Sequence, residues 1–253
     1  MRSFFCAVMA VVALLSSHAV AQDPTALRVY SSNGVRIVLQ EMQPRIEAAV
    51  GKPLSFEFST ARTLVQQLAD GAAFDVAVLT PALIDELIDA GRVAADSRID
   101  VARVGIGVGA RQGTPARSVA TLDELRSTLL AAGSVAFGAN GQSRQTNEAS
   151  FAALGIADDM RAKVRLTGPG EAPVLVAAGE VDLVLTLISE LLREPGVQFL
   201  GPLPAEVQAY IRFAAGTSAG THDRAAAAAF VRALSTADFA AALERHGLEP
   251  VTP

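Results

Sequence analysis

The chain contains few of the side chains that usually carry metal, redox or proton-transfer chemistry. It has 253 residues with one cysteine, Cys6, three histidines and no tryptophan, and its only lysines are Lys52 and Lys163. A single cysteine excludes an intrachain disulfide and a cysteine-rich metal site. The lack of tryptophan and an aromatic content of 5% disfavour a platform on which bases or sugars stack. We therefore expect no metal and no cofactor.

Large single-sign charge and long apolar segments are also missing. The formal net charge is −5, which gives no basic surface for nucleic acid. Beyond the N-terminus, no apolar run reaches the roughly 20 residues that a membrane-spanning helix needs. The length indicates one large domain or two small ones.

The first 21 residues have the organisation of a secretory signal peptide. Arg2 gives a basic start, an apolar run extends over residues 4–15, and residues 19–21 read Ala-Val-Ala. We predict cleavage after Ala21, which also removes Cys6 and His18, and a soluble periplasmic protein. The alternative is an N-terminal helix kept in the fold, although the segment shows no amphipathic pattern.

Short β-type runs alternate with helical stretches along the remaining chain. The predicted strands are 27–31, 54–59, 75–79, 104–110, 135–138, 164–167, 182–187, 197–202 and 210–215. The predicted helices are 34–50, 63–70, 81–91, 121–132, 143–154, 173–178, a short one after 187, 222–234 and 237–246. This alternation predicts an α/β fold with mixed, mainly parallel sheets covered by helices. The number of strands favours two lobes, with the last strands returning to the first lobe.

Four strands end in small, polar or glycine-containing turns that precede a helix. These turns are Ser31-Ser32-Asn33, Ser59-Thr60-Ala61, Gly138-Ala139-Asn140-Gly141 and Thr167-Gly168-Pro169-Gly170. Ligands of open α/β sheets bind beyond the carboxyl ends of the strands. Helix N-termini carry free N–H groups and partial positive charge, so they suit anions. The turns predict an anion site, although ordinary strand-to-helix turns use the same residue types.

Several segments resemble the periplasmic molybdate-binding proteins of ABC importers, a branch of the two-lobed solute-binding proteins. They are LRVYSSNGV, FEFSTARTLVQQLADGAAFDVAVLT, VGIGVGAR, VDLVLTLISELL and VQFLGPLPAEVQ. The resemblance covers nearly all of the chain after residue 21. It implies two α/β lobes that are joined by two crossing strands and close over a ligand. One lobe would contain residues 22–103 and 205–253, and the other residues 104–204.

The predicted binding residues combine the turns with positions that the resemblance supplies. In the molybdate binders, hydroxyls and backbone N–H groups hold the oxyanion. The serine positions of the first two turns fall here on Gly34 and Ala61, and the position of a family tyrosine falls on Leu187. The predicted contacts are Ser31, Ser32, Asn33, Gly34, Thr60, Ala61, Arg62, Ser143, Arg144, Gly168, Gly170 and Leu187. This shifted hydroxyl pattern leaves the anion open, either a molybdate-like oxyanion or a small organic carboxylate.

Arg62 and Arg144 each fall at the start of a predicted helix, one in each lobe. A cation there meets the positive end of the helix dipole, which is mildly unfavourable. A guanidinium that forks onto an anion would explain both positions, because it binds a planar carboxylate through two hydrogen bonds. The alternative is that both point into water or pair with local acids such as Asp70 or Glu148.

Enzyme motifs are absent from the sequence. His222 and His246 flank helices, and no His-x-x-x-His, Gly-x-Ser-x-Gly or P-loop pattern occurs. The glycines of residues 105–109 fall inside a predicted strand, so they do not form a dinucleotide fingerprint and are interpreted as part of a hinge strand. Asp75 and Asp182 are interpreted as turn or cap residues. Glu171 and Glu190 could meet a polar part of a ligand, but neither is predicted as a contact.

The sequence therefore predicts a monomeric, non-enzymatic solute receptor. It would capture a small anion between its lobes and deliver the anion to an ABC permease of the inner membrane. One alternative is a carboxylate-binding or sensing protein without a transporter. The other is an exported enzyme on the same scaffold.

Overall fold

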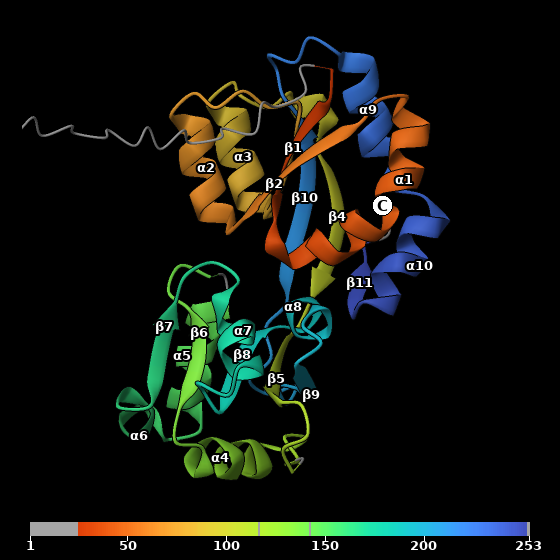
Figure 1. Cartoon of the computed structure of the whole chain (residues 1–253). Helices are drawn as coiled ribbons and strands as arrows, with labels where there is room; N and C mark the ends of the chain where they lie inside the picture. Colours follow the sequence, from red (N-terminus) through yellow and green to blue (C-terminus); the bar gives the residue numbers. More distant parts are fainter. Residues whose placement is uncertain (1–24, 116, 142, 252–253) are drawn as a thin grey trace, which may run out of the picture.

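The computed structural model describes residues 25–115, 117–141 and 143–251. The predicted signal peptide, residues 1–21, lies outside the described residues. The chain forms two sheets with helices around each, stacked end to end in Figure 1. We call the six-stranded sheet with its helices the first lobe, and the five-stranded sheet with its helices the second lobe. The predicted two-lobed α/β fold is confirmed.

The first lobe contains strands from both ends of the chain. Its strand order is β11-β4-β10-β3-β1-β2. The strands are β1 (Leu27–Ser32), β2 (Leu54–Ser59), β3 (Val76–Leu79), β4 (Ile99–Val104), β10 (Ile211–Thr217) and β11 (Leu248–Pro250). The helices are η1 (Asn33–Val35), α1 (Arg36–Val50), α2 (Ala61–Ala69), α3 (Pro81–Asp89), η2 (Ala95–Ser97), α9 (Arg224–Ala233) and α10 (Ala237–Arg245). Strands β1 to β3 are parallel, whereas β10 is antiparallel to β3 and β4.

The second lobe is built from the middle of the chain. Its strand order is β7-β6-β8-β5-β9. The strands are β5 (Ile106–Arg111), β6 (Val135–Gly138), β7 (Val164–Thr167), β8 (Leu183–Leu187) and β9 (Val197–Pro202). The helices are α4 (Leu122–Ala131), α5 (Ser143–Ala153), α6 (Ala157–Arg161), α7 (Glu171–Ala177) and α8 (Ile188–Arg193). Strands β6, β7 and β8 are parallel, and β5 opposes both β8 and β9.

The central strands bury side chains on both faces, as parallel strands covered by helices do. In β3, Val76 and Val78 belong to the core beneath α1, α9 and α10, whereas Ala77 and Leu79 belong to the core beneath α2 and α3. Figure 1 shows these two groups of helices on opposite sides of the first sheet. All four side chains are buried because successive residues of a strand point to opposite faces.

Two connections join the lobes. The predicted strand 104–110 is two strands, because β4 ends at Val104 in one sheet and β5 begins at Ile106 in the other. Gln208, on the return connection from β9 to β10, accepts a hydrogen bond from the Ile106 N–H at 2.8 Å and donates one to the Ile106 carbonyl at 2.9 Å. The side chain of one connection therefore fastens the backbone of the other.

The glycines within β5 allow close packing against neighbouring elements. A Cβ at Gly107 would lie 2.6 Å from the ring of Phe199, and one at Gly109 would lie 2.7 Å from Val197. Neither glycine has a positive φ. Small residues are needed here because β9 and α8 pack directly against the backbone of β5. Gly105 lies on the crossing itself, between β4 and β5, and a hinge role for this glycine run stays a prediction.

Sequence signals located most elements, and two of the exceptions are instructive. The predicted helix over residues 121–132 is present as α4, and it begins with a capping box in which Thr121 and Glu124 bond each other's backbone. Strand β4 was missed outside residue 104 because Asp100 and Arg103 interrupt its apolar pattern. Strand β11 was missed because it is only three residues long. Within the described part of the chain, no single helix is long and apolar enough to cross a membrane, and α9 and α10 pass that test only as a pair bent by 56°.

Candidate functional site

A small cavity of about 40 Å³ lies between the lobes, at the carboxyl ends of several strands. That volume accommodates a few water molecules or a small anion. Its lining comes from both lobes and is mostly small or polar: Ser32, Asn33, Thr60, Ala61, Gly138, Gly141, Ser143, Thr167, Gly168, Pro169, Gly170, Ala172, Pro173, Thr186, Leu187 and Glu190. All four predicted turns contribute to this lining.

The first lobe presents hydroxyl and amide groups at the ends of β1 and β2. Ser32 is the last residue of β1, and Asn33 begins the 3-10 turn that follows. Thr60 is the N-cap of α2, and its hydroxyl accepts the Thr63 N–H at 3.3 Å and lies 2.7 Å from the Thr63 hydroxyl. The cap fixes the start of α2, whose first backbone N–H groups have no carbonyl partner within the helix.

The second lobe presents Ser143 at the start of α5 and Thr167 at the end of β7. Asn147, one turn further along α5, donates to the Leu185 carbonyl of β8 at 3.0 Å and so holds this helix against the sheet. The Gly168 N–H donates to Glu171 at 2.8 Å, which shapes the glycine turn before α7. Helix starts from both lobes therefore border one cavity.

Glu190 is the only residue with an ionisable side chain among the described residues that line the cavity. It lies in the first turn of α8, and its Oε2 accepts a short hydrogen bond from the Thr186 hydroxyl at the end of β8. Burial raises the pKa of the Glu190 carboxyl, whereas the Thr186 hydrogen bond and the charge of Arg193 act in the opposite direction. The cavity wall thus contains a carboxyl group whose pKa is raised by burial.

A cationic group that was not predicted lies beside the cavity. A Cβ built on Gly170 would lie 3.9 Å from a terminal nitrogen of Arg193 and 3.7 Å from Nδ2 of Asn33. The pKa of Arg36 is lowered by burial and by the charge of Arg193, so a second guanidinium is near. The sequence signal for Arg193 was weak, because a basic residue in the last turn of a helix is common.

Two predicted contacts of the first turn lie behind the cavity lining. Ser31 is fully buried, and its hydroxyl donates to the Ser32 carbonyl at 3.3 Å. Gly34 packs so tightly that a Cβ would lie 2.3 Å from Phe213 and 2.7 Å from Leu187. Its carbonyl accepts the Ser189 hydroxyl at 2.6 Å. A serine cannot occupy this position without rearrangement, so Ser32 and Asn33 present the polar groups instead.

The two predicted arginines also lie outside the lining, and each has a local acid. Arg144 donates to Glu148 at 2.8 Å and to the Ala139 carbonyl at 2.9 Å. Arg62 is exposed and lies 3.6 Å from Glu86. Pairing with Glu148 was the alternative stated for Arg144. The Arg144–Glu148 pair lies within one turn of α5, whereas the Arg62–Glu86 pair joins α2 to α3.

The remaining predicted residues all line the cavity: Ser32, Asn33, Thr60, Ala61, Ser143, Gly168, Gly170 and Leu187. Their roles as ligand contacts stay predictions. Thr186 and Glu190 were not predicted as contacts, although they belong to the segment VDLVLTLISELL. The sequence signal that could have identified them is the hydroxyl of Thr186 near the end of a predicted strand, followed four residues later by the acid Glu190.

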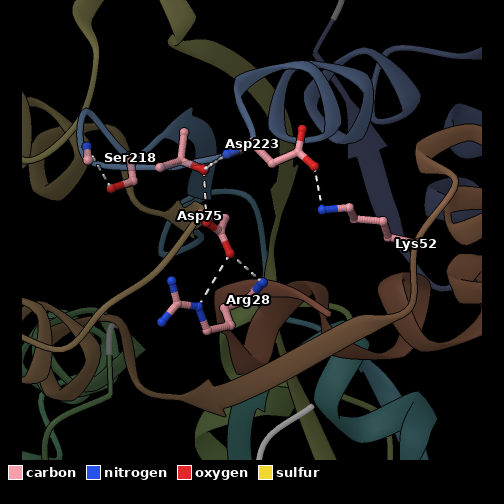
Figure 2. Close-up of polar contacts among 7 residues, drawn as sticks. Arg28, Lys52, Asp75, Ser218 and Asp223 are labelled. Carbon is pink, nitrogen blue, oxygen red and sulfur yellow. Dashed lines mark hydrogen bonds and ion pairs between the residues drawn. The ribbon is translucent and has the colours of Figure 1, made fainter. Parts of the chain in front are cut away.

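Asp75 belongs to a different polar cluster, at the amino end of β3 (Figure 2). Its carboxylate accepts the Arg28 backbone N–H at 2.8 Å, the Arg28 Nε at 3.4 Å and the Thr221 hydroxyl at 2.8 Å. Thr221 also accepts the Asp223 N–H at 3.2 Å, and Asp223 pairs with Lys52. Asp75 therefore joins the starts of β1 and β3 to the loop before α9, which agrees with its predicted turn role.

Comparison with known proteins places the chain in a family. Residues 27–249 match the model of the bacterial extracellular solute-binding proteins, and the chain belongs to this family. The resemblance to the molybdate-binding proteins is confirmed at the level of fold. The periplasmic molybdate-binding protein of Azotobacter vinelandii superposes with a TM-score of 0.76 and 16% identity, over 90% of this chain and 99% of that one.

Two further relatives bind or act on other anions. The sulfate-binding protein of Mycobacterium tuberculosis superposes with a TM-score of 0.71 and 18% identity, over 90% of this chain and 88% of that one. An aconitate isomerase from a Pseudomonas species is 29% identical over 236 residues, which is 91% of this chain and 90% of the relative. The chain is thus similar in fold to anion-binding proteins and in sequence to an enzyme.

Proposed function

We propose that this protein is an extracytoplasmic receptor that captures a small anion between its lobes and delivers it to an ABC permease. The observation that carries the proposal is the cavity lined by hydroxyls and helix starts from both lobes. Family membership supports the class of function. The anion is a small organic carboxylate or a molybdate-like oxyanion.

Binding would use neutral donors rather than a direct ion pair. The hydroxyls of Ser32, Thr60 and Ser143 border the cavity, together with the amide of Asn33. The starts of α2 and α5 add backbone N–H groups and the positive ends of two helix dipoles. Because these groups belong to both lobes, an anion between them would favour the closed arrangement over an open one.

Titration calorimetry tests the proposal directly. Purified protein lacking residues 1–21 is titrated with molybdate, tungstate, sulfate and a panel of mono-, di- and tricarboxylates. We expect heat from at least one of these anions, and a weakening of about tenfold in Thr60→Val or Ser143→Ala, since each removes a hydrogen bond to a charged ligand worth about 1.5–3 kcal/mol. Small-angle scattering should show compaction on binding. A wild-type protein that binds none of the panel would refute the proposal.

Delivery to a permease is tested separately from capture. The candidate permease is reconstituted in proteoliposomes, and uptake of the labelled anion is followed with and without this protein. Dependence of uptake on the protein supports the transport role. Tight capture without any stimulated uptake would instead favour a binding or sensing protein that has no transporter.

A second candidate function is isomerisation of an unsaturated carboxylate. Two observations favour it: the 29% identity with an aconitate isomerase over 91% of this chain, and a carboxyl group in the cavity wall whose pKa is raised by burial. A tricarboxylate is larger than the cavity, so the lobes would have to open to admit it. Incubation of the protein with cis- or trans-aconitate, monitored by proton NMR, decides this. Interconversion that disappears in Glu190→Gln would establish the enzyme, whereas unchanged spectra would exclude this activity.

A further inference from the structure

Two nitrogen donors, one from each lobe, border the same small space at the edge of the cavity. Gly170 lines the cavity from the turn before α7. A Cβ built on it would lie 3.7 Å from Nδ2 of Asn33 and 3.9 Å from Nη2 of Arg193. Apart from the two chain neighbours of Gly170, no other described residue has a heavy atom within 4 Å of that point. An amide of the first lobe and a guanidinium of the second lobe can therefore reach one ligand group.

Both donors lack a protein partner. Asn33 is only 9% exposed and lines the cavity, yet its side-chain amide forms no hydrogen bond within the part of the chain that the structure describes. No described carboxylate oxygen lies within 4.0 Å of the Arg193 guanidinium, although Glu190 is one turn away on the same helix. A buried donor without an acceptor is costly, so a ligand that supplies the acceptor is favoured.

The backbone at Gly170 keeps this space open. Its φ is 74°, in the left-handed region, where a residue with a side chain is strained. Any Cβ at this position would also fill the space between Asn33 and Arg193. Glycine is therefore required both by the turn and by access to the two donors.

A second cation of the first lobe strengthens the positive potential there. Arg36 begins α1, directly after η1, and both elements pack against α8. Its guanidinium lies 5.0 Å from the centre of the Phe58 ring and donates to Gln40 at 3.3 Å, and it has no acid partner among the described residues. Even with Glu190 ionised, the side chains of Arg36, Arg193 and Glu190 carry one net positive charge. An anion that enters between the lobes reduces the repulsion between the two cations.

The cavity and the guanidinium are suited to different parts of a ligand. About 40 Å³ accommodates one carboxylate-sized group, and the hydroxyls of Ser32, Thr60 and Ser143 border it. Arg193 is not part of that lining and lies at its edge, beyond Gly170. A guanidinium binds a carboxylate through two parallel hydrogen bonds. The arrangement therefore offers one place with neutral donors and a second with a cation.

We propose that the ligand is a short dicarboxylate, with one carboxylate in the cavity and the other bound between Arg193 and Asn33. This inference rests on the proposed function and names the ligand class among the small organic carboxylates. Because Arg193 and Asn33 belong to different lobes, the second carboxylate joins the lobes and rewards closure. Arg193 is thus the residue that distinguishes a dicarboxylate from a monocarboxylate of the same length.

Paired ligands provide the test. Malonate, succinate and glutarate are titrated into the protein lacking residues 1–21 at about pH 8, where carboxyl groups are ionised. Each is compared with its own monomethyl ester, which keeps the length but loses one negative charge. We expect at least one dicarboxylate to bind about tenfold or more tightly than its ester, as the loss of a charge-assisted hydrogen bond predicts.

Two variants assign that difference to Arg193. Arg193→Gln should weaken the dicarboxylate about tenfold and the monoester by less than about threefold, so that the preference is nearly lost. Arg193→Lys keeps the charge without the planar fork and should retain part of the preference. Arg165→Gln is the control, since Arg165 is an exposed arginine of the same lobe that lies 3.6 Å from Glu180. It should bind both ligands as the wild type does.

The outcomes separate the inference from the function on which it depends. Equal affinity for a dicarboxylate and its monoester, or equal weakening of both in Arg193→Gln, would overturn the inference and leave the receptor function intact. Binding of molybdate or sulfate without binding of any dicarboxylate would do the same. If no anion of either panel binds, the proposed function fails and the inference fails with it.

Discussion

The first sheet and the cleft each contain a carboxyl group that accepts a hydrogen bond from a threonine hydroxyl, and the rest of their surroundings differ. Asp75, at the amino end of β3, accepts three hydrogen bonds from Arg28 and Thr221. Glu190 lines the cavity and accepts a hydrogen bond from the Thr186 hydroxyl. A buried carboxylate whose lone pairs are satisfied stabilises the fold, whereas one with unused capacity is available to a ligand.

We expect the largest change in the free energy of unfolding on substitution of Asp75, whose carboxylate accepts three hydrogen bonds. Asp75→Ala leaves the Arg28 side chain and N–H and the Thr221 hydroxyl without their acceptor, and should lower the free energy of unfolding by about 3 kcal/mol. Chemical denaturation measures the change. Thr221→Val, which removes one neutral donor, should cost about 1 kcal/mol. Anion affinity of the folded fraction should stay unchanged in both variants, and a selective loss of affinity would assign Asp75 to the site.

Substitution of Gly34 tests whether close packing against Phe213 and Leu187 is the reason for a glycine at this position. Gly34→Ser restores the hydroxyl position of the molybdate-binding proteins but places a Cβ against Phe213 and Leu187. Overpacking of this kind costs about 1–3 kcal/mol, so thermal unfolding should begin at a lower temperature. Gly51→Ser is a useful contrast, since that glycine has open space but a φ of 76°. Tighter anion binding with unchanged stability in Gly34→Ser would contradict the packing argument.

Glu190 should destabilise the fold where Asp75 stabilises it. The pKa of Glu190 is raised in the folded protein, so the folded state binds more protons than the unfolded state once the pH exceeds the ordinary glutamate value. Stability contributed by this group is therefore complete at lower pH and is lost as pH rises through the folded pKa, by at most about 1.4 kcal/mol per pH unit.

Glu190→Gln removes this dependence. The variant should be more stable than wild type above the pKa of Glu190, and the difference should disappear near pH 4. Urea unfolding at several pH values provides the measurement. A variant that is less stable at neutral pH would mean that the ionised carboxylate is the favourable form.

We expect the smallest changes in anion affinity on substitution of Arg62 and Arg144. Arg62 pairs with Glu86 on an exposed surface, and Arg144 with Glu148, and neither lines the cavity. Exposed pairs contribute about 0–1 kcal/mol. Arg62→Ala and Arg144→Ala should therefore change anion affinity by less than about fivefold, whereas Arg193→Ala should weaken it more. A hundredfold loss of anion affinity in Arg62→Ala would instead support direct binding of the anion by this guanidinium.

Sequence reasoning located the cavity better than it located the individual contacts. The rule that ligands bind at the carboxyl ends of strands identified all four turns, because strand and helix periodicity is a local property of the chain. It could not separate Ser31 from Ser32, since adjacent residues of a strand point to opposite faces and the facing lobe decides which face meets the ligand. It also could not decide whether Arg144 binds an anion or pairs with Glu148, and the structure shows the pair.

The amino-acid sequence by itself determined the alternation of strands and helices, the two-lobed α/β class and the polar, cation-poor character of the strand-end turns. Those features follow from hydrophobic periodicity, helix capping and turn chemistry, all of which act over a few residues. The tertiary structure alone decided that Gly34 is closed to a side chain, that β4 and β5 belong to different sheets and that Glu190 lines the cavity beside Thr186. Each of these depends on side chains that are distant in sequence and meet only when the lobes are assembled.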